Sequence, residues 1–149
     1  AQMIATTTKL NTPGPDLAAI DGVHALTDVT GFGLAGHALE LARGAKCTVR
    51  IDWASVPLLD GVRTLAGQGF VTGASGRNWA GYGHDVDVPA SLAPEDRALL
   101  TDPQTSGGLL VSCTPAAVDA VLASFRQHGF GAAAVVGRIE AGAPRLVVA

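Results

Sequence analysis

The sequence predicts a sandwich of helices on a mixed β-sheet, of the α+β or α/β class. Hydrophobic residues make up 48% of the 149 residues and charged residues 15%, as expected for a globular chain with a real core. Apolar spacing indicates two strand–helix–strand units followed by two strands near the C-terminus. We therefore expect one domain over residues 1–149.

The first half of the chain alternates helical spacing with short extended runs. Leu34, Ala38 and Leu41 share one helix face, and Gly44 is placed to end that helix. A glycine-rich stretch over 73–83 predicts a mobile or functional loop, in which Arg77 is the expected anion contact. The other predicted elements are a helix over 2–10 within a lead-in segment 1–20, a break at 11–15, a short helix over 16–20, strands over 27–30 and 48–53, and helices over 34–43 and 57–67.

The second half carries clearer start and stop signals. Thr114-Pro115 is a cap followed by proline at the first helical position, and an amphipathic pattern runs on to His128. The tight turn at 140–144 predicts a terminal hairpin. The remaining elements expected here are a helix over 94–100, a strand over 109–113, and the two hairpin strands over 133–139 and 145–148.

Composition excludes several functional classes. Ten Lys and Arg residues and a net charge of −3 do not supply the basic face of a nucleic-acid-binding protein. No run reaches eighteen apolar residues, so we expect no membrane span. Cys47 and Cys113 are distant in sequence and lack metal-ligand spacing, which favours buried thiols in a reducing compartment. The expected location is the cytoplasm, and the first residue, which is not Met, indicates a fragment.

The stretch from Ala25 to Arg43 predicts a strand, a glycine turn and a helix. The free N–H groups at the start of such a helix favour an anion beyond the turn. Asp28 faces the same space, where a carboxylate and an anion in contact repel by roughly 4 kcal/mol at intermediate dielectric. A divalent cation between them removes this conflict. The candidate phosphate-site residues are Asp28, Thr30, Gly31 and Gly33, and Asp28 is the candidate metal ligand.

Other interpretations of the same turn remain open. Residues 31–36 fit the G-x-G-x-x-G pattern, and Asp52 is placed to bind a ribose hydroxyl, as in dinucleotide-binding folds. Against this, polar residues interrupt the preceding strand, which a parallel sheet would bury on both faces. A purely structural turn is the third interpretation. His37 is either a core histidine with its hydrogen bonds satisfied or a phosphate or proton contact beside the turn.

Two motifs together resemble a known family. They are Thr27-Asp28-Val29-Thr30-Gly31-Phe32-Gly33-Leu34-Ala35-Gly36-His37 and Thr101-Asp102-Pro103-Gln104-Thr105-Ser106-Gly107-Gly108-Leu109-Leu110. In order and spacing they resemble selenophosphate synthetase (selenide, water dikinase), and Arg77-Asn78 resembles the segment between them. The resemblance covers nearly the whole chain, as the C-terminal half of a larger two-domain enzyme of the aminoimidazole ribonucleotide synthetase superfamily. It implies a three-layer α/β/α sandwich that is partly ferredoxin-like.

The resemblance also implies a reaction. ATP, selenide and water give selenophosphate, AMP and phosphate, with Mg2+ on the phosphates, and the family's motif aspartate helps to hold the metal. That aspartate corresponds to Asp28. The family's reactive cysteine or selenocysteine, its essential lysine and its other metal-binding aspartates belong to the N-terminal half. We therefore expect the isolated chain to be inactive, and the full-length enzyme to be a homodimer.

Two other functions fit the same residues. One is another ATP-using enzyme of the superfamily, and the other is a non-catalytic ligand-binding or structural domain. An upstream glycine-rich segment with Cys or Sec and Lys would favour the synthetase.

Overall fold

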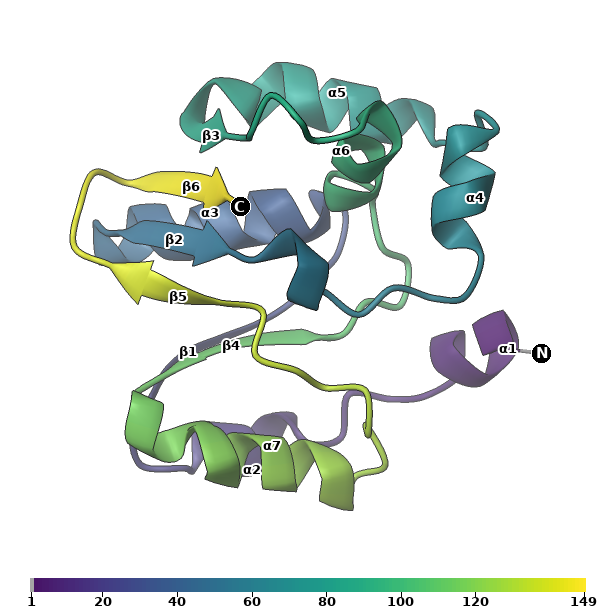
Figure 1. The fold of residues 1–149 in the computed structure, drawn as a ribbon. Coiled ribbons are helices and arrows are strands. Elements are labelled where there is room, and N and C mark those ends of the chain that lie inside the picture. The colour runs from purple at the N-terminus through teal and green to yellow at the C-terminus, as the bar shows by residue number, and fades with distance from the viewer. Residues whose placement is uncertain (1) are drawn as a thin grey trace.

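The computed structural model describes residues 2–149. These residues form seven α-helices, six strands and three short 3-10 turns (Figure 1). The helices are α1 (Gln2–Thr7), α2 (Gly14–Ala18), α3 (Gly33–Ala45), α4 (Val62–Gly67), α5 (Gly73–Tyr82), α6 (Pro94–Leu100) and α7 (Val118–Gln127). The strands are β1 (Val23–Asp28), β2 (Thr48–Ile51), β3 (Val86–Asp87), β4 (Leu109–Cys113), β5 (Gly137–Glu140) and β6 (Arg145–Val148), and the 3-10 turns are η1 (Trp53–Ser55), η2 (Gly83–Asp85) and η3 (Pro115–Ala117).

The strands form two sheets. The larger sheet has the order β3-β6-β2-β5, in which β6 runs parallel to β2 and β3, and β5 runs antiparallel to β2. The smaller sheet is the antiparallel pair β1-β4, with a register shift between Val23 and Ala25. The mixed sheet and the α+β class predicted from the sequence are thus confirmed.

Each sheet carries its own hydrophobic core. One face of α3 packs on β2 and β6 through Ala35, Ala38 and Leu39, and this core continues to Leu100 in α6. On the other side of the molecule, α2 and α7 cover the β1-β4 pair (Figure 1). The strand pair β1-β4 therefore lies between α7 and the start of α3, and the turn that follows β1 leads from one core to the other.

The segment before β1 is attached to α7. Leu17 is fully buried in the second core. His128, at the end of α7, lies 2.8 Å from Asp16 Oδ2 through Nε2 and 3.0 Å from the Thr12 hydroxyl through Nδ1. The Lys9 ammonium lies 3.9 Å from the centroid of the Phe130 ring. Much of the predicted lead-in segment 1–20 thus packs as part of the fold.

The predicted terminal hairpin is wrong. β2 lies between β5 and β6 and pairs with both, so these two strands are not neighbours. Val49 and Ile51 of β2 are buried, as is usual for a central strand. Two strands with a third strand between them are about 10 Å apart. The four residues 141–144 can span up to about 14 Å. The connection is therefore long enough to pass over β2, which the turn signal alone does not reveal.

The predicted mobile loop over 73–83 is also wrong, because this stretch is helix α5. The Thr72 side chain caps the helix by accepting a hydrogen bond from the Ser75 N–H at 3.2 Å. Ser75 is buried and its hydroxyl donates to the Ala98 carbonyl at 2.8 Å. Each glycine destabilises a helix by about 1 kcal/mol relative to Ala. The cap and the packing against α6 outweigh this cost.

Other boundaries differ by a few residues. The strand expected at 27–30 begins earlier, at Val23, and the helix expected from Pro57 begins only at Val62. α3 continues past Gly44, and Lys46 ends it in the left-handed region at φ 52°. The helix predicted over 2–10 ends at Thr7, the strand predicted over 133–139 is reduced to Gly137–Glu140, and the helix predicted from Thr114 starts with the turn η3.

The dinucleotide-binding interpretation is wrong as well. It requires a parallel strand–helix–strand unit, but β1 and β2 belong to different sheets and β1 pairs antiparallel with β4. Asp52 instead accepts a hydrogen bond from the Ser55 hydroxyl at 2.6 Å.

Candidate phosphate and metal site

The two sequence motifs meet along the β1-β4 pair. Asp28, the last residue of β1, is opposite Leu109 in the register. The pairing continues for one residue beyond the strand, because the Val29 N–H donates to the Gly108 carbonyl at 2.9 Å. The Thr30 carbonyl then accepts from the Gln104 N–H at 3.0 Å. A continuous run of backbone hydrogen bonds thus joins two segments that are more than seventy positions apart in the sequence.

Two glycines allow this close approach. A Cβ on Gly107 would lie 1.8 Å from the Val29 carbonyl oxygen. Gly33 has φ +69°, and a Cβ there would lie 2.7 Å from the Thr101 carbonyl carbon. Both distances are shorter than real Cβ contacts, so only glycine fits these positions. Gly33 and Gly107 are therefore explained by backbone contact between the two motifs.

Helix α3 begins directly at the glycine turn. Its N-cap position, Phe32, supplies no side-chain cap, and the Gly33 N–H donates back to the Thr30 carbonyl at 3.0 Å. An uncapped helix start of this kind favours an anion. Gly31 is exposed, whereas Gly33 is buried and its N–H is already used. Of the two predicted phosphate-site glycines, Gly31 is thus the accessible one, while Gly33 packs against Thr101.

The Asp28 side chain is exposed at the end of β1. Within residues 2–149 its carboxylate takes part in no hydrogen bond or ion pair, so its oxygens are available to a ligand. Carboxylate oxygens are the ligands that Mg2+ prefers, so this side chain fits the predicted metal. Among the described residues, 2–149, no three His, Cys, Asp or Glu side chains gather as a metal site. Asp28 can therefore be one ligand of a metal but not a complete site.

His37 lies one turn into α3 and is only 7% exposed. Its Nε2 is 3.1 Å from the Thr30 hydroxyl, and its Nδ1 is 3.0 Å from a carboxylate oxygen of Glu40. The Phe32 ring lies beside it, with 5.8 Å between ring centroids. His37 is thus buried, as the core interpretation predicted, but its Nδ1 makes no hydrogen bond, and its Nε2 contacts the predicted phosphate-site residue Thr30.

Helix α5 holds the two motifs together from outside. Asn78 Nδ2 donates to the Gly31 carbonyl at 2.9 Å and to the Thr101 carbonyl at 3.0 Å. The Tyr82 hydroxyl donates to the Phe32 carbonyl. From the sequence we expected an anion contact from the neighbouring Arg77, which is exposed, and named Asn78 only for its resemblance, so we assigned neither Asn78 nor Tyr82 this supporting role. The signal for Asn78 is its uncharged amide, which can cross-link carbonyls when its helix packs on the turn.

Burial changes the acidity of Tyr82. Desolvation raises the pKa of its hydroxyl from 10.0 to about 12, partly opposed by a hydrogen bond from the Gly36 backbone. The hydroxyl, which is protonated at neutral pH even at its ordinary pKa, donates to the Phe32 carbonyl, and the raised pKa extends this protonated form to more alkaline pH. Gly36 also leaves room for the Tyr82 ring, because a Cβ there would lie 3.1 Å from Tyr82 Cε1.

The second motif has its own polar contacts. The Thr72 hydroxyl donates to Asp102 Oδ1 at 3.0 Å, and Gln104 Nε2 donates to the Asp102 carbonyl at 3.1 Å. Thr101 is buried, and its hydroxyl lies 2.6 Å from that of Ser75. The second motif is thus fixed to the start of α5 as well as to the glycine turn.

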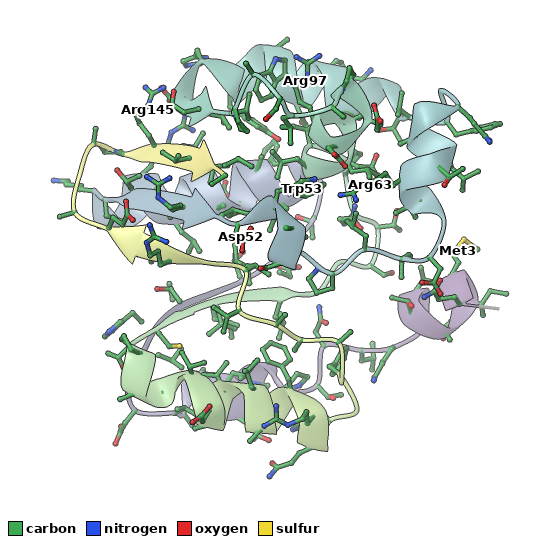
Figure 2. The ribbon with its side chains drawn as sticks, in the orientation of Figure 1. Met3, Asp52, Trp53, Arg63, Arg97 and Arg145 are labelled. Atoms are coloured by element: carbon green, nitrogen blue, oxygen red, sulfur yellow. The ribbon has the colours of Figure 1, made fainter. Side chains whose placement is uncertain are left out.

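A surface hollow of about 530 Å3 lies elsewhere in the molecule. Trp53 and Arg63, which line it, lie between the end of β2 and α4 (Figure 2). Arg63 and Asp96, which both line the hollow, form an ion pair of 2.7 Å. No residue of the two motifs lines this hollow, so the hollow is separate from the predicted phosphate site.

Comparison with known proteins identifies the family. The chain matches the family described as AIR synthase related protein, C-terminal domain, over residues 5–149. The chain belongs to this family.

No helix within residues 2–149 combines the length and apolar character needed to cross a membrane.

Within this family the chain is similar to proteins named selenide, water dikinase. It is 64% identical over 149 residues to that of Burkholderia orbicola, which covers the whole chain and 42% of the relative. It is also 64% identical over 146 residues to that of Pseudomonas straminea, covering 98% of the chain and 41% of the relative. The resemblance seen in the two motifs is thus confirmed. The chain spans about two fifths of the length of these relatives.

Solved structures share the fold. A crystal structure of E. coli HypE superposes with a TM-score of 0.65 at 20% identity, covering 93% of this chain and 35% of that one. A structure of the hydrogenase maturation protein HypE in complex with ATP gives a TM-score of 0.57 at 20% identity, covering 85% of this chain and 32% of that one. At this identity the likeness establishes the fold alone.

Proposed function

We propose that this chain is the C-terminal domain of an ATP-dependent selenophosphate synthetase. The enzyme converts ATP, selenide and water into selenophosphate, AMP and phosphate. The domain contributes Asp28 as a ligand of Mg2+, and the glycine turn with Thr30 and Gly31 as part of the phosphate site. Identity of 64% to selenide, water dikinases supports the reaction.

One observation carries the assignment of the site. Asp28 with its accessible carboxylate, Thr30 and the uncapped start of α3 follow one another within residues 28–33, and the second motif fixes this stretch by backbone hydrogen bonds. A lone carboxylate beside a phosphate is unfavourable, and Mg2+ shared between them makes the pair favourable. The residues present therefore fit a shared metal and phosphate site.

The remaining parts of the site come from the N-terminal part of the enzyme. Phosphoryl transfer depends on several charges held together, and one aspartate beside one turn does not supply them. The 149-residue chain alone is therefore expected to give no selenide-dependent AMP above a no-protein control. The proposal includes a single domain over 1–149 with lead-in 1–20, the three-layer α/β/α arrangement that is partly ferredoxin-like, a homodimeric full-length enzyme, and a cytoplasmic location.

The test is Asp28→Asn in the full-length enzyme, with Asp21→Asn as matched control. Asn keeps the size of the side chain but loses the charge that attracts Mg2+. We expect Asp28→Asn to lose most selenide-dependent AMP production at saturating Mg2+ with little change in melting temperature. Asp21 is exposed in the turn before β1, and its variant is expected to keep the wild-type rate. Near-normal activity of Asp28→Asn would remove the metal-ligand role. AMP formation independent of selenide would instead favour another ATP-using enzyme.

A further inference from the structure

His37 is a buried polar side chain between two oxygen atoms. Its Nε2 lies 3.1 Å from Thr30 Oγ1, and its Nδ1 lies 3.0 Å from Glu40 Oε2. The Nδ1 contact is within ion-pair distance, but its angle is not that of an in-line hydrogen bond. Burying an imidazole nitrogen is costly unless a neighbouring group compensates it, so both contacts constrain where the ring proton resides.

The carboxylate of Glu40 places the proton on Nδ1. A carboxylate is an acceptor only, and a neutral imidazole has one N–H and one bare nitrogen. Although the contact is not in line, the negative Glu40 oxygen lies 3.0 Å from Nδ1, where it attracts the positive end of an N–H dipole and repels the electron-rich side of a bare nitrogen. The favoured form of His37 therefore carries its proton on Nδ1.

This tautomer fixes the direction of the hydrogen bond to Thr30. With Nδ1 protonated, Nε2 is an acceptor, so the Thr30 hydroxyl must donate its only proton to His37. Thr30 Oγ1 then has lone pairs left and no proton for a second partner. A phosphate oxygen is also an acceptor, so Thr30 cannot donate a hydrogen bond to it in this arrangement. A cation can bind the lone pairs.

Asp28 and Thr30 are placed to act on the same ligand. They flank Val29, which is 8% exposed, while Asp28 is exposed and Thr30 is half-buried. Alternation along an extended segment puts residues two apart on the same side. The backbone pairing of Val29 with Gly108 and of Thr30 with Gln104 keeps this segment extended.

We propose that His37 is a positioning residue, which holds the Thr30 hydroxyl proton so that Thr30 Oγ1 joins the Asp28 carboxylate in binding one divalent cation. The inference rests on the proposed function and revises one part of it, because Thr30 then binds the cation and Gly31 alone of these two residues remains in the phosphate site. The phosphate is then bound by the metal and by the N–H groups at the start of α3.

The first test reads the tautomer directly in the 15N-labelled chain. Long-range 1H–15N correlation spectra at neutral pH distinguish a protonated from a bare ring nitrogen. The signals of His37 are assigned by their loss in His37→Gln, with His24, His84 and His128 as internal references. We expect a protonated Nδ1 and a bare Nε2. A protonated Nε2 would overturn the proposal without affecting the assignment of Asp28.

The second test uses Mn2+ alone as a probe of the cation site. We expect Mn2+ to broaden the amide signals of residues 28–31 in the wild-type chain, and Asp28→Asn to abolish this. Thr30→Val removes a direct oxygen ligand and His37→Leu removes the group that orients it, so each is expected to weaken the Mn2+ affinity by about tenfold or more. Thr30→Ser keeps the hydroxyl and His37→Gln keeps an acceptor, so both are expected to retain the affinity within a few-fold.

The outcomes separate the two claims. Broadening around Asp28 that is unchanged in His37→Leu and Thr30→Val would overturn the role of His37 and leave the metal role of Asp28 in place. No broadening around Asp28 in the wild type would overturn the proposed cation pair, and the activity of Asp28→Asn in the full-length enzyme would then decide the metal role of Asp28. Because the tautomer is measured on the wild-type chain, a variant that fails to fold does not remove the test.

Discussion

At the scale of single residues, the contact between the motifs depends on Gly107. We predict that Gly107→Ala strongly destabilises the chain, because its Cβ would lie 1.8 Å from the Val29 carbonyl oxygen. Overpacking of this kind costs about 1–3 kcal/mol in the free energy of unfolding. Gly108→Ala is the matched control, since nothing lies within 4 Å of a Cβ there. Urea denaturation measures both variants, and equal stabilities would contradict the close approach of the two motifs.

Tyr82 gives a second prediction at this scale, because it is the single tyrosine of the chain. Its pKa is raised to about 12 by burial, whereas an unfolded tyrosine ionises near 10. The folded state thus holds the proton more tightly, so this contribution to stability is present below pH 10 and is lost as the pH rises from 10 toward 12. Absorbance titration at 295 nm is expected to show a midpoint near 12 for the folded chain and near 10 in denaturant. A folded-state midpoint near 10 would contradict the burial of the hydroxyl.

At the scale of elements, helix α5 shows what sequence reasoning missed. Four glycines in 73–83 indicate a flexible segment when only local propensity is considered. The cap at Thr72 is a local start signal that the glycines obscured. The bonds of Ser75 and Asn78 to neighbouring segments are tertiary and have no local pattern. By contrast, the helix over Pro94–Leu100 and the strand over Leu109–Cys113 were predicted correctly, because their start signals and apolar runs are local.

We therefore predict that the amides in the second half of α5 exchange slowly in the free chain. Hydrogen-exchange mass spectrometry is the measurement. Thr72→Ala is expected to accelerate exchange there, since loss of a cap costs about 1 kcal/mol. Thr64→Ala, at an exposed position in α4, serves as control and is expected to leave α5 unchanged. Exchange in α5 at the rate of an unstructured peptide would show that the segment is mobile.

The pairing of the C-terminal strands also depends on tertiary contacts that the local sequence does not reveal. The strands β5 and β6 were expected, but their separation by β2 was not. A turn pattern predicts that the chain reverses, and it does not predict whether another strand lies between the two strands that the turn connects. Buried Val49 and Ile51 in β2 need partners on both sides, and the two C-terminal strands supply them.

At the scale of the whole molecule, the fold brings the two motifs to one end of the β1-β4 pair. Asp28, Thr30 and Gly31 were chosen from sequence because a strand, a glycine turn and a helix start have local signatures. The contributions of His37, Asn78 and Tyr82 depend on which helices pack over the turn, so sequence spacing could not assign them. The strand, turn and helix start that hold these residues were therefore predictable from the sequence, whereas the neighbouring side chains were not, and the metal and phosphate roles stay predictions.

The central claim is that Asp28 binds a divalent metal together with phosphate. Its most direct test is Mn2+ binding to the full-length enzyme in the presence of ATP, followed by electron paramagnetic resonance for the wild type, Asp28→Asn and the Asp21→Asn control. We expect Asp28→Asn to weaken Mn2+ binding by about tenfold or more, because a ligand charge is lost, and Asp21→Asn to match the wild type. Identical Mn2+ binding by the wild type and Asp28→Asn would contradict the central claim.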